Sequence, residues 1–349
     1  MKTKLLYFHA GKSSFVLKDI EILEEDFYVI DFFFDTADKK KYLRQFFNQL
    51  LFIITHIFNS KIIVCQFAGN HTFLPILFSK LFFKKSAIVA GGTDCVSFPS
   101  INYGNFNNSF LSKTTSFSFK RCDLILPVHK TLVEYEYTYQ TNDFKKQGYN
   151  FFIKNIKTPY QIIYNGYDSI KWSCTSLKQK YSFATIGAGL NSRFGFNLKG
   201  IDLIFEIAEK FPNCTFYIVG GKDIDKPKPT NIILLDKIPN EQLPEFLSSI
   251  QFYLQLSMSE GFPNALSEAM LCECVPIVSA VGVMPDIVGD CGYILKHKNI
   301  NELYDVFNYA LNNFDLDNLG KKARHKISKN YTFENRKEKL LHAINSLIR

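Results

Sequence analysis

The feature that most limits the fold of this chain is an alternation of short apolar runs with longer amphipathic segments. Runs rich in β-branched and aromatic residues are typical of buried parallel strands, and the segments between them have the spacing of crossover helices. The alternation therefore predicts an α/β fold built on parallel sheets. In the first half we expect strands at residues 5–8, 28–33, 61–65, 86–90, 124–127 and 161–164, and helices at residues 14–24, 42–58, 73–83 and 130–139.

The alternation pauses after Asp168, where a polar stretch extends to Lys180, and then resumes. The chain has 349 residues, which is long enough for two domains with separate cores. We predict doubly wound domains at residues 1–168 and 169–330, and a C-terminal helix at residues 331–349 that packs back on the first domain. In the second half we expect strands at residues 182–187, 215–219, 232–235, 252–256, 276–279 and 293–295, and helices at residues 201–210, 241–249 and 263–272.

Composition and charge limit the partners and the cellular location that we expect for the protein. The net charge of +8 favours anionic partners, but the basic residues are too dispersed for a nucleic-acid-binding arm. The eight cysteines form no CxxC pairs, which is typical of reduced thiols in a cytoplasmic protein. The apolar run at the start ends at His9, too early for a signal peptide. Lys84, Lys85 and the lysines at residues 39–41 predict peripheral contact with an anionic membrane.

The segment at residues 259–288 carries the strongest chemical signal. Glu260 lies in the loop that leaves a predicted strand, and Pro263 suits the first position of the following helix. The free N–H groups of Asn264 and Ala265 then point out of the helix start and form an anion site that fits a phosphate. Glu268 lies five residues into the helix, where its carboxylate can accept hydrogen bonds from a vicinal diol. Solvated helix acids are the alternative interpretation for both glutamates.

This segment resembles the retaining glycosyltransferases of family four, whose signature is two glutamates separated by seven residues within an EGFP, EAM and PVV framework. The resemblance implies the GT-B fold, in which two Rossmann-like domains face a central cleft. It also implies that Glu260 contacts the donor sugar, that Glu268 holds the ribose, and that the backbone at Gly261, Phe262, Pro263 and Asn264 approaches a diphosphate.

A second glycine-rich loop follows the predicted strand at residues 182–187. It fails as a dinucleotide fingerprint because Ser192 occupies the third glycine position. The family resemblance implies that Gly187 approaches the donor and that Arg193 and Lys199 neutralise its diphosphate. Surface cations are the alternative interpretation of both basic residues.

The first domain gives weaker signals. Gly11 would let a phosphate or an acceptor approach the backbone, and Asp94 is a candidate to hold a sugar hydroxyl or to act on the acceptor. A loop-capping role for Asp94 is an equal alternative. A structural role is the better interpretation of His71.

We expect a glycosyltransferase that uses a nucleotide diphosphate sugar as donor and a saccharide or lipid-linked acceptor, in cell-surface polysaccharide or glycolipid assembly. We expect neither a cofactor nor a metal, and we interpret the pairs Asp223 with Asp225 and Asp315 with Asp317 as solvated acids. The alternatives are a nucleotide-sugar epimerase or a phosphorylase on the same fold, and a non-catalytic module that binds nucleotide sugars.

Overall fold

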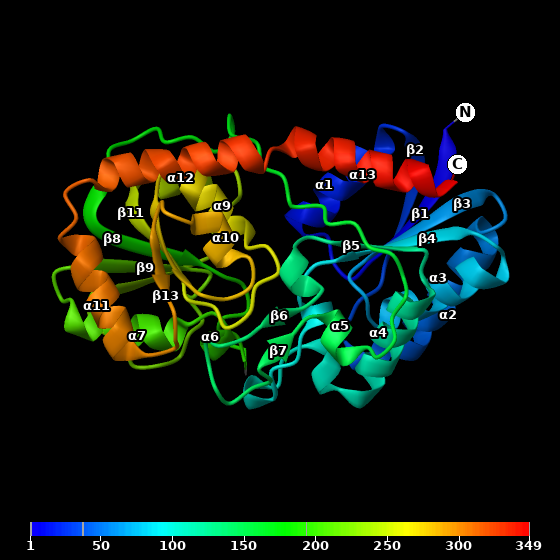
Figure 1. Cartoon of the computed structure of the whole chain (residues 1–349), viewed down its shortest axis with the longest axis horizontal. Coiled ribbons are helices and arrows are strands. Elements are labelled where there is room, and N and C mark those ends of the chain that lie inside the picture. The colour runs from blue at the N-terminus through cyan, green and yellow to red at the C-terminus, as the bar shows by residue number, and fades with distance from the viewer. Residues whose placement is uncertain (1, 37, 193, 349) are drawn as a thin grey trace.

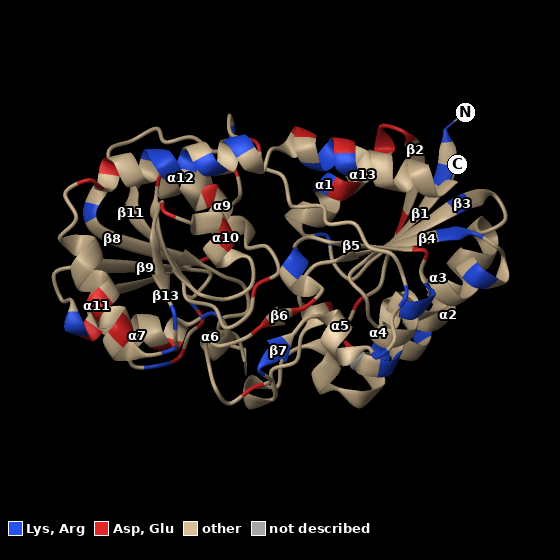
Figure 2. Ribbon diagram, in the orientation of Figure 1, with Lys and Arg blue, Asp and Glu red and all other residues tan. Residues whose placement is uncertain are grey.

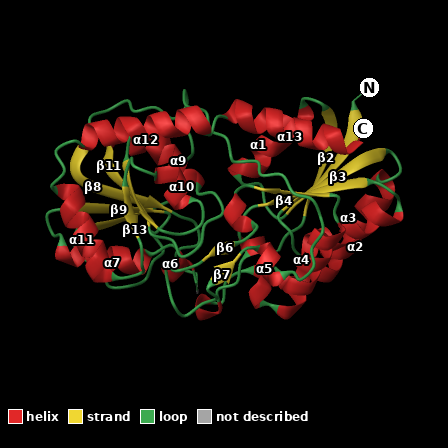
Figure 3. Cartoon of the chain, in the orientation of Figure 1, coloured by secondary structure: helices red, strands yellow, loops and turns green. Residues whose placement is uncertain are grey.

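The computed structural model of the protein describes residues 2–36, 38–192 and 194–348. Two α/β domains lie side by side, and helices cover both faces of the sheet in each (Figure 1, Figure 3). The predicted α/β fold with two Rossmann-like domains is confirmed. No helix in these described ranges is long and apolar enough to cross a membrane.

The first sheet is parallel, with the order β2-β1-β3-β4-β5 that is typical of flavodoxin-like folds. Its strands are β1 (Thr3–His9), β2 (Phe27–Phe33), β3 (Ser60–Gln66), β4 (Lys85–Ala90) and β5 (Leu124–Pro127). The helices around it are α1 (Ser14–Glu24), α2 (Tyr42–His56), α3 (Asn70–Leu81), α4 (Ser109–Arg121) and the short α5 (Tyr149–Phe152).

The second sheet is also parallel and has the order β10-β9-β8-β11-β12-β13, the arrangement of a dinucleotide-binding fold. Its strands are β8 (Gln179–Ile186), β9 (Thr215–Val219), β10 (Ile232–Leu235), β11 (Ile250–Gln255), β12 (Val275–Ser279) and β13 (Tyr293–Leu295). The helices around it are α6 (Gly195–Leu198), α7 (Ile201–Lys210), α8 (Leu243–Ser249), α9 (Asn264–Leu271), α10 (Met284–Val288), α11 (Ile300–Leu311) and α12 (Leu316–Asn330).

The strand order reverses between β1 and β3 in the first sheet and between β8 and β11 in the second. Open α/β sheets bind their ligands beyond the carboxyl ends of the strands at such a reversal. The loops that leave β8 and β11 are the two segments for which the sequence predicts donor contacts. The topology therefore places both of them at the expected ligand position.

The predicted helix at residues 130–139 is wrong. The chain forms a 3-10 turn at Lys130–Leu132 and then the strand β6 (Tyr135–Glu136), which pairs antiparallel with β7 (Lys146–Gln147). Tyrosines at 135, 137 and 139 recur with a period of two, which favours an extended chain.

The predicted strand at residues 161–164 is also wrong, because it pairs with β5 only irregularly. The N–H groups of Gln161 and Ile163 donate to the carbonyl oxygens of Ile125 and Pro127. Pro127 has no N–H to return a hydrogen bond, so the ladder is interrupted at that residue.

Two segments of chain cross between the domains side by side. The first contains Tyr167, and the second contains Tyr331 and Phe333 and leads into α13 (Phe333–Ile348). The N–H of Tyr167 donates to the carbonyl of Tyr331 at 2.9 Å, and the N–H of Phe333 donates to the carbonyl of Tyr167 at 3.1 Å. After the second crossing, α13 lies against α1 of the first domain (Figure 1).

A buried ion pair holds α13 on the first domain. The Arg336 guanidinium donates from Nε and Nη2 to the two carboxylate oxygens of Asp19, each at 2.7 Å. Its third nitrogen donates to the carbonyl oxygens of Ile163 and Tyr164. Both charged side chains are at least 97% buried, so each depends on the other for its hydrogen bonds.

We predict that Arg336→Met lowers the free energy of unfolding by about 3–5 kcal/mol, because it leaves the Asp19 carboxylate buried without a partner. Urea denaturation of the full chain measures the loss. Lys337→Met is the matched control, since Lys337 pairs with the exposed Glu25 and its removal should change stability little. Equal effects of the two substitutions would contradict the role of the buried pair.

Candidate functional site

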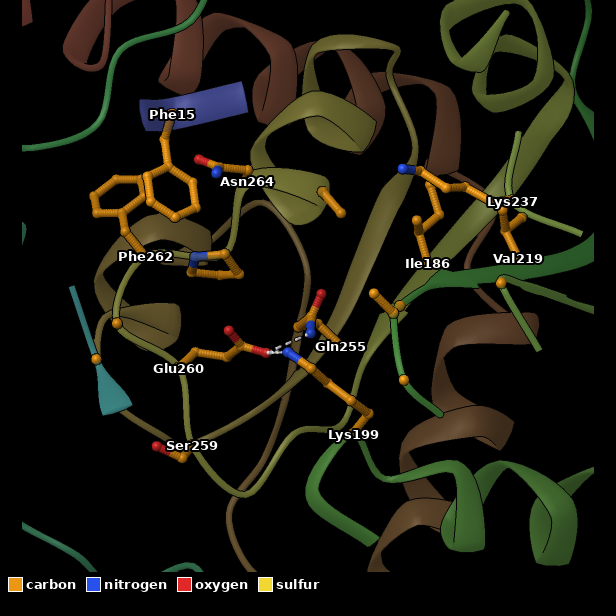
Figure 4. Close-up of a pocket in the computed structure, with 18 of the residues that line it drawn as sticks. Phe15, Ile186, Lys199, Val219, Lys237, Gln255, Ser259, Glu260, Phe262 and Asn264 are labelled. Atoms are coloured by element: carbon orange, nitrogen blue, oxygen red, sulfur yellow. Dashed lines mark hydrogen bonds and ion pairs between the residues drawn. The ribbon is translucent and has the colours of Figure 1, made fainter. Parts of the chain in front are cut away.

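A cavity of about 730 Å³ lies between the domains at the carboxyl ends of β8 and β11 (Figure 4). Its wall from the second domain includes the loop after β8, the loop after β11 and the start of α9. Its wall from the first domain is made by Phe15, Phe67, Gly91, Gly92, Thr93 and Tyr103.

A charged cluster lies on the floor of the cavity. Lys199 Nζ donates to Glu260 Oε1 at 2.7 Å, and Gln255 Nε2 donates to the same oxygen at 2.9 Å (Figure 4). Burial favours the neutral amine, but the charge and hydrogen bond of Glu260 outweigh it and raise the pKa of Lys199. The structure thus brings together two residues predicted from separate motifs. Gln255, which the sequence interpretation missed, is the polar residue that ends β11.

The loop after β8 forms the side of the cavity next to Lys199. Gly187 and Gly189 both line it, and Gly187 is held in place by its N–H, which donates to the carbonyl of Val219. The hydroxyl of Ser192 accepts from the N–H of Gly195 and closes the loop. Arg193, the other predicted diphosphate ligand, lies outside the described residues.

The loop after β11 reaches the first domain at Gly261. A Cβ at this position would lie 1.8 Å from the carbonyl oxygen of Gly91, so only glycine permits the two backbones to approach so closely. The following Phe262 is buried and packs its ring against Tyr164, Tyr167 and Tyr331. Phe262 therefore fixes one domain against the other as well as lining the cavity.

The start of α9 faces the same cavity through Pro263, Asn264 and Ala265. Pro263 precedes the helix as its N-cap and is not its first residue, a shift of one position from the prediction. The side-chain oxygen of Asn264 accepts hydrogen bonds from Asn165 and Tyr167, at 3.1 and 2.7 Å. These bonds orient the helix start relative to the first crossing segment.

Glu268 lines a second cavity of about 480 Å³, beside the first crossing segment, and does not line the first cavity. Lys18, Lys171 and Trp172 line the same space. Burial raises the pKa of Glu268 to about 7, although the charges of Lys18 and Lys171 oppose the rise. The structure thus separates the two glutamates of the motif, and the ribose contact of Glu268 stays a prediction.

Asp94 caps its own loop, as the alternative interpretation of the sequence has it, and is not among the residues that line the cavity; a contact with a sugar or an acceptor stays a prediction. It is fully buried, and its carboxylate accepts hydrogen bonds from the N–H groups of Ala68, Gly91 and Gly92 at 3.0, 3.2 and 2.9 Å. Burial raises its pKa in spite of these bonds. Asp94 instead shapes the loop that carries Gly91 and Gly92 to the cleft.

Gly11 and His71 also lie away from the cavity lining. A Cβ added at Gly11 would meet nothing within 4 Å, so packing does not require glycine there. The ring of His71 is buried, with Nε2 3.0 Å from the carbonyl oxygen of Gln66, and burial lowers its pKa to about 4. His71 is therefore neutral and structural.

The described residues contain no group of three or more histidine, cysteine, aspartate or glutamate side chains arranged to hold a metal ion. Asp223 lines the outer part of the cavity and is exposed, as is Asp225.

Comparisons with known proteins identify the family of the second domain and the fold of the chain. Residues 192–331 match the family Glycosyl transferases group 1. This span includes Lys199, Glu260 and Glu268. The predicted resemblance is confirmed at this level, whereas the assignment to retaining family four stays a prediction. No curated protein matches the chain significantly.

The chain also resembles solved GT-B structures over its whole length. Sucrose-phosphate synthase from Thermosynechococcus elongatus has a TM-score of 0.74 at 12% identity, with 99% of each chain covered. HepE from Anabaena, solved with UDP-glucose, has a TM-score of 0.72 at 14% identity, with 99% of this chain and 100% of HepE covered. The catalytic domain of starch synthase IV from Arabidopsis thaliana, bound to ADP and acarbose, has a TM-score of 0.70 at 10% identity over all of both chains. The protein thus has the GT-B fold.

We predict that Glu268 makes the stability of the protein depend on pH. Its folded-state pKa of about 7 exceeds its ordinary value of 4.5, so the folded chain holds a proton that the unfolded chain has lost. Its contribution to stability is therefore present at low pH and is lost as the pH rises toward 7. Glu268→Gln cannot ionise and should gain about 2–3 kcal/mol relative to the wild type between pH 5 and pH 8.

Urea denaturation at the two pH values measures this difference. Glu245→Gln is the control, because the Glu245 side chain is exposed and the substitution should alter neither midpoint. A pH-independent difference between Glu268→Gln and the wild type would contradict the prediction.

Proposed function

We propose that the protein is a glycosyltransferase that moves a sugar from a nucleoside diphosphate sugar to an acceptor hydroxyl. The observation that carries this proposal is the cluster of Lys199, Glu260 and Gln255 in the interdomain cavity, at the strand-order reversal of the second domain. The match to Glycosyl transferases group 1 over the same residues supports it.

In the proposed complex the second domain holds the donor. The backbone from Gly187 to Gly189 and the start of α9 approach the diphosphate, where N–H groups and the helix dipole favour negative charge. Apolar residues of the cavity, including Ile186, Val219 and Ile238, would contact the base. The solved neighbours that carry UDP, UDP-glucose or ADP support a nucleotide donor.

The first domain is proposed to hold the acceptor, a saccharide or a lipid-linked sugar in cell-surface polysaccharide or glycolipid assembly. Tyr103 and Thr93 from this domain line the cavity opposite Lys199, and their hydroxyl oxygens lie 2.7 Å apart. Hydroxyl and aromatic groups of this kind suit a sugar surface. Closure of the domains would exclude water from the reaction.

The ion pair between Lys199 and Glu260 suggests how donor binding prepares the site. The donor diphosphate competes for the Lys199 ammonium, because phosphate oxygens are strong acceptors for a lysine point charge. Loss of this partner frees Glu260 Oε1 to accept a hydrogen bond from a sugar hydroxyl. The same event thus neutralises the leaving group and positions the sugar.

We propose a retaining reaction that needs no metal. The bond between the anomeric carbon and the phosphate oxygen breaks, and the acceptor oxygen attacks from the same face. The proton of the acceptor hydroxyl passes to the departing phosphate. Lys199 and the helix start stabilise the charge that develops on that phosphate, and Glu260 favours the cationic sugar.

The direct test is a thermal-shift screen of UDP- and ADP-linked sugars, followed by an assay of nucleoside diphosphate release with saccharide acceptors. Release that depends on an acceptor supports a transferase. Isomerised donor indicates an epimerase, donor formation from phosphate indicates a phosphorylase, and binding without turnover indicates a non-catalytic module. Loss of activity with EDTA and recovery with manganese would contradict the metal-independent reaction.

We predict that Lys199→Ala lowers the affinity for the nucleoside diphosphate by about 10- to 100-fold, since hydrogen bonds to charged groups contribute roughly 1.5–3 kcal/mol. The affinity for the nucleoside alone should be nearly unchanged, which calorimetry with both ligands shows. Lys210→Ala removes an exposed lysine at the end of α7 and serves as the control. Equal losses for nucleoside and diphosphate would reject the phosphate contact.

Glu260→Gln should reduce kcat by more than it reduces donor affinity, because the amide keeps a hydrogen bond but loses the charge that favours the transition state.

Proton NMR of the first product formed by the wild type should show the anomeric configuration of the donor. An inverted product would overturn the retaining mechanism, and a kcat unchanged by Glu260→Gln would overturn the role of Glu260.

A further inference from the structure

The outer face of α2 exposes a row of large apolar side chains. The row contains Leu43, Phe47, Leu51 and Ile54 on the helix and Phe58 just after it, and we call these five residues the α2 stripe. Their exposed fractions range from 47% at Ile54 to 87% at Leu43. At 3.6 residues per turn the four residues on the helix occupy an arc of about 80° around its axis. They therefore form one continuous strip along the length of the helix.

The α2 stripe is separate from the face that α2 packs against its own domain. Gln49 and Ile53 are buried on that inner face. A helix on the surface of a soluble domain normally directs charged and polar groups outward. A contiguous exposed apolar patch instead marks a surface that another molecule or a membrane covers.

The end of α3 extends the apolar surface. The ring of Phe58 packs edge-on against Phe82 at 5.1 Å, so the end of the stripe adjoins this turn. Leu81 and Phe83 are 59% and 95% exposed. Phe83 has a φ of 52° because it is the residue after the helix cap, where the N–H of Lys84 donates to the carbonyl of Ser79 at 2.7 Å and closes the end of α3.

Basic groups surround the stripe. Residues 39–93 contain no acidic residue and include Lys40, Arg44, Lys61, Lys80, Lys84 and Lys85 among their basic residues. Figure 2 shows segments with Lys or Arg, in blue, near α2, α3 and β4.

Two acids close to these basic residues are already paired, Asp38 with Lys41 at 3.1 Å and Asp123 with Lys80 at 2.6 Å. A third acid, Asp35, lies near Tyr42 at the start of α2. Lys40, Arg44 and Lys85 are exposed, and Lys84 Nζ donates to the carbonyl oxygen of Phe58. Positively charged side chains therefore border the α2 stripe.

We propose that the α2 stripe, together with Leu81 and Phe83, docks the first domain on an anionic lipid membrane. The apolar side chains enter the boundary between headgroups and acyl chains, and the surrounding lysine and arginine side chains contact lipid phosphates. The basic residues around the α2 stripe favour an anionic membrane over a second copy of the chain. Two copies that met through this surface would bring Lys40, Arg44 and Lys85 of each toward like charges, whereas anionic headgroups complement them.

The test is flotation of the full chain with vesicles of 70% phosphatidylcholine and 30% phosphatidylglycerol at low salt. The protein should float with these vesicles and should bind pure phosphatidylcholine vesicles at least tenfold more weakly. Binding to the anionic vesicles should also fall at high salt, since salt screens the contribution of the basic residues.

Two pairs of variants separate the apolar and charged contributions. Leu43→Ser with Phe47→Ser should lower binding by about tenfold or more, because it removes apolar area from the membrane contact. Ile170→Ser with Leu177→Ser removes apolar side chains that are at least as exposed, from the polar stretch after Asp168, and should change nothing. Arg44→Gln with Lys85→Gln should lower binding by about tenfold or more. Lys321→Gln with Lys322→Gln, on exposed positions of α12, is the matched control.

Three results would overturn the proposal. The first is a wild type that fails to float with the anionic vesicles. The second is a control pair that weakens binding as much as its test pair. The third is a dimer in sedimentation equilibrium that Leu43→Ser with Phe47→Ser dissociates, which would assign the surface to a second copy of the chain.

Discussion

Parallel strand pairing is the constraint on which the rest of this structure depends. Each crossover returns the chain to the same starting side of its sheet, so every loop that follows a strand emerges at one edge. Lys199 and Glu260 are 61 residues apart in the sequence, yet their side chains meet because β8 and β11 are neighbouring strands. The contact between these two side chains therefore follows from the strand order of the second sheet. Parallel pairing in the first domain likewise brings the loop of Gly91 to the opposite wall of the cleft.

Contacts between the domains set the width of that cleft. The buried ring of Phe262 lies among tyrosines of the crossing segments, and Asp286 of α10 pairs with Lys130 at 2.9 Å. His129 lies 3.3 Å from the same carboxylate, but burial lowers its pKa to about 4 although Asp286 acts in the opposite direction. The Lys130 ammonium therefore supplies the charge across the interface, and the His129 ring contributes as a neutral, packed group.

Local periodicity predicted part of the fold, although the amphipathic helices α11 and α12 were not among the expected helices. The helix expected at residues 14–24 coincides with α1, because its apolar spacing and its packing surface agree. The helix α4 was missed, since its serine- and threonine-rich segment lacks such spacing and is stabilised by the Asn108 cap and by packing on α3. In the site, the motif placed Glu260 at the cleft. The capping role of Asp94 could not be chosen over its alternative from the sequence, because it depends on N–H groups that converge only in the folded loop. The part of Gln255 in the site follows only from the hydrogen bond of its amide to Glu260.

The paired crossing segments have a mechanical consequence. A single flexible linker would let the second domain swivel in any direction about the first. Here two segments of chain cross side by side and are joined by hydrogen bonds at Tyr167, so we expect this double connection to oppose twisting of one domain about the other. We also expect it to guide Gly261 back to the same register against Gly91 whenever the domains close, without a search over orientations.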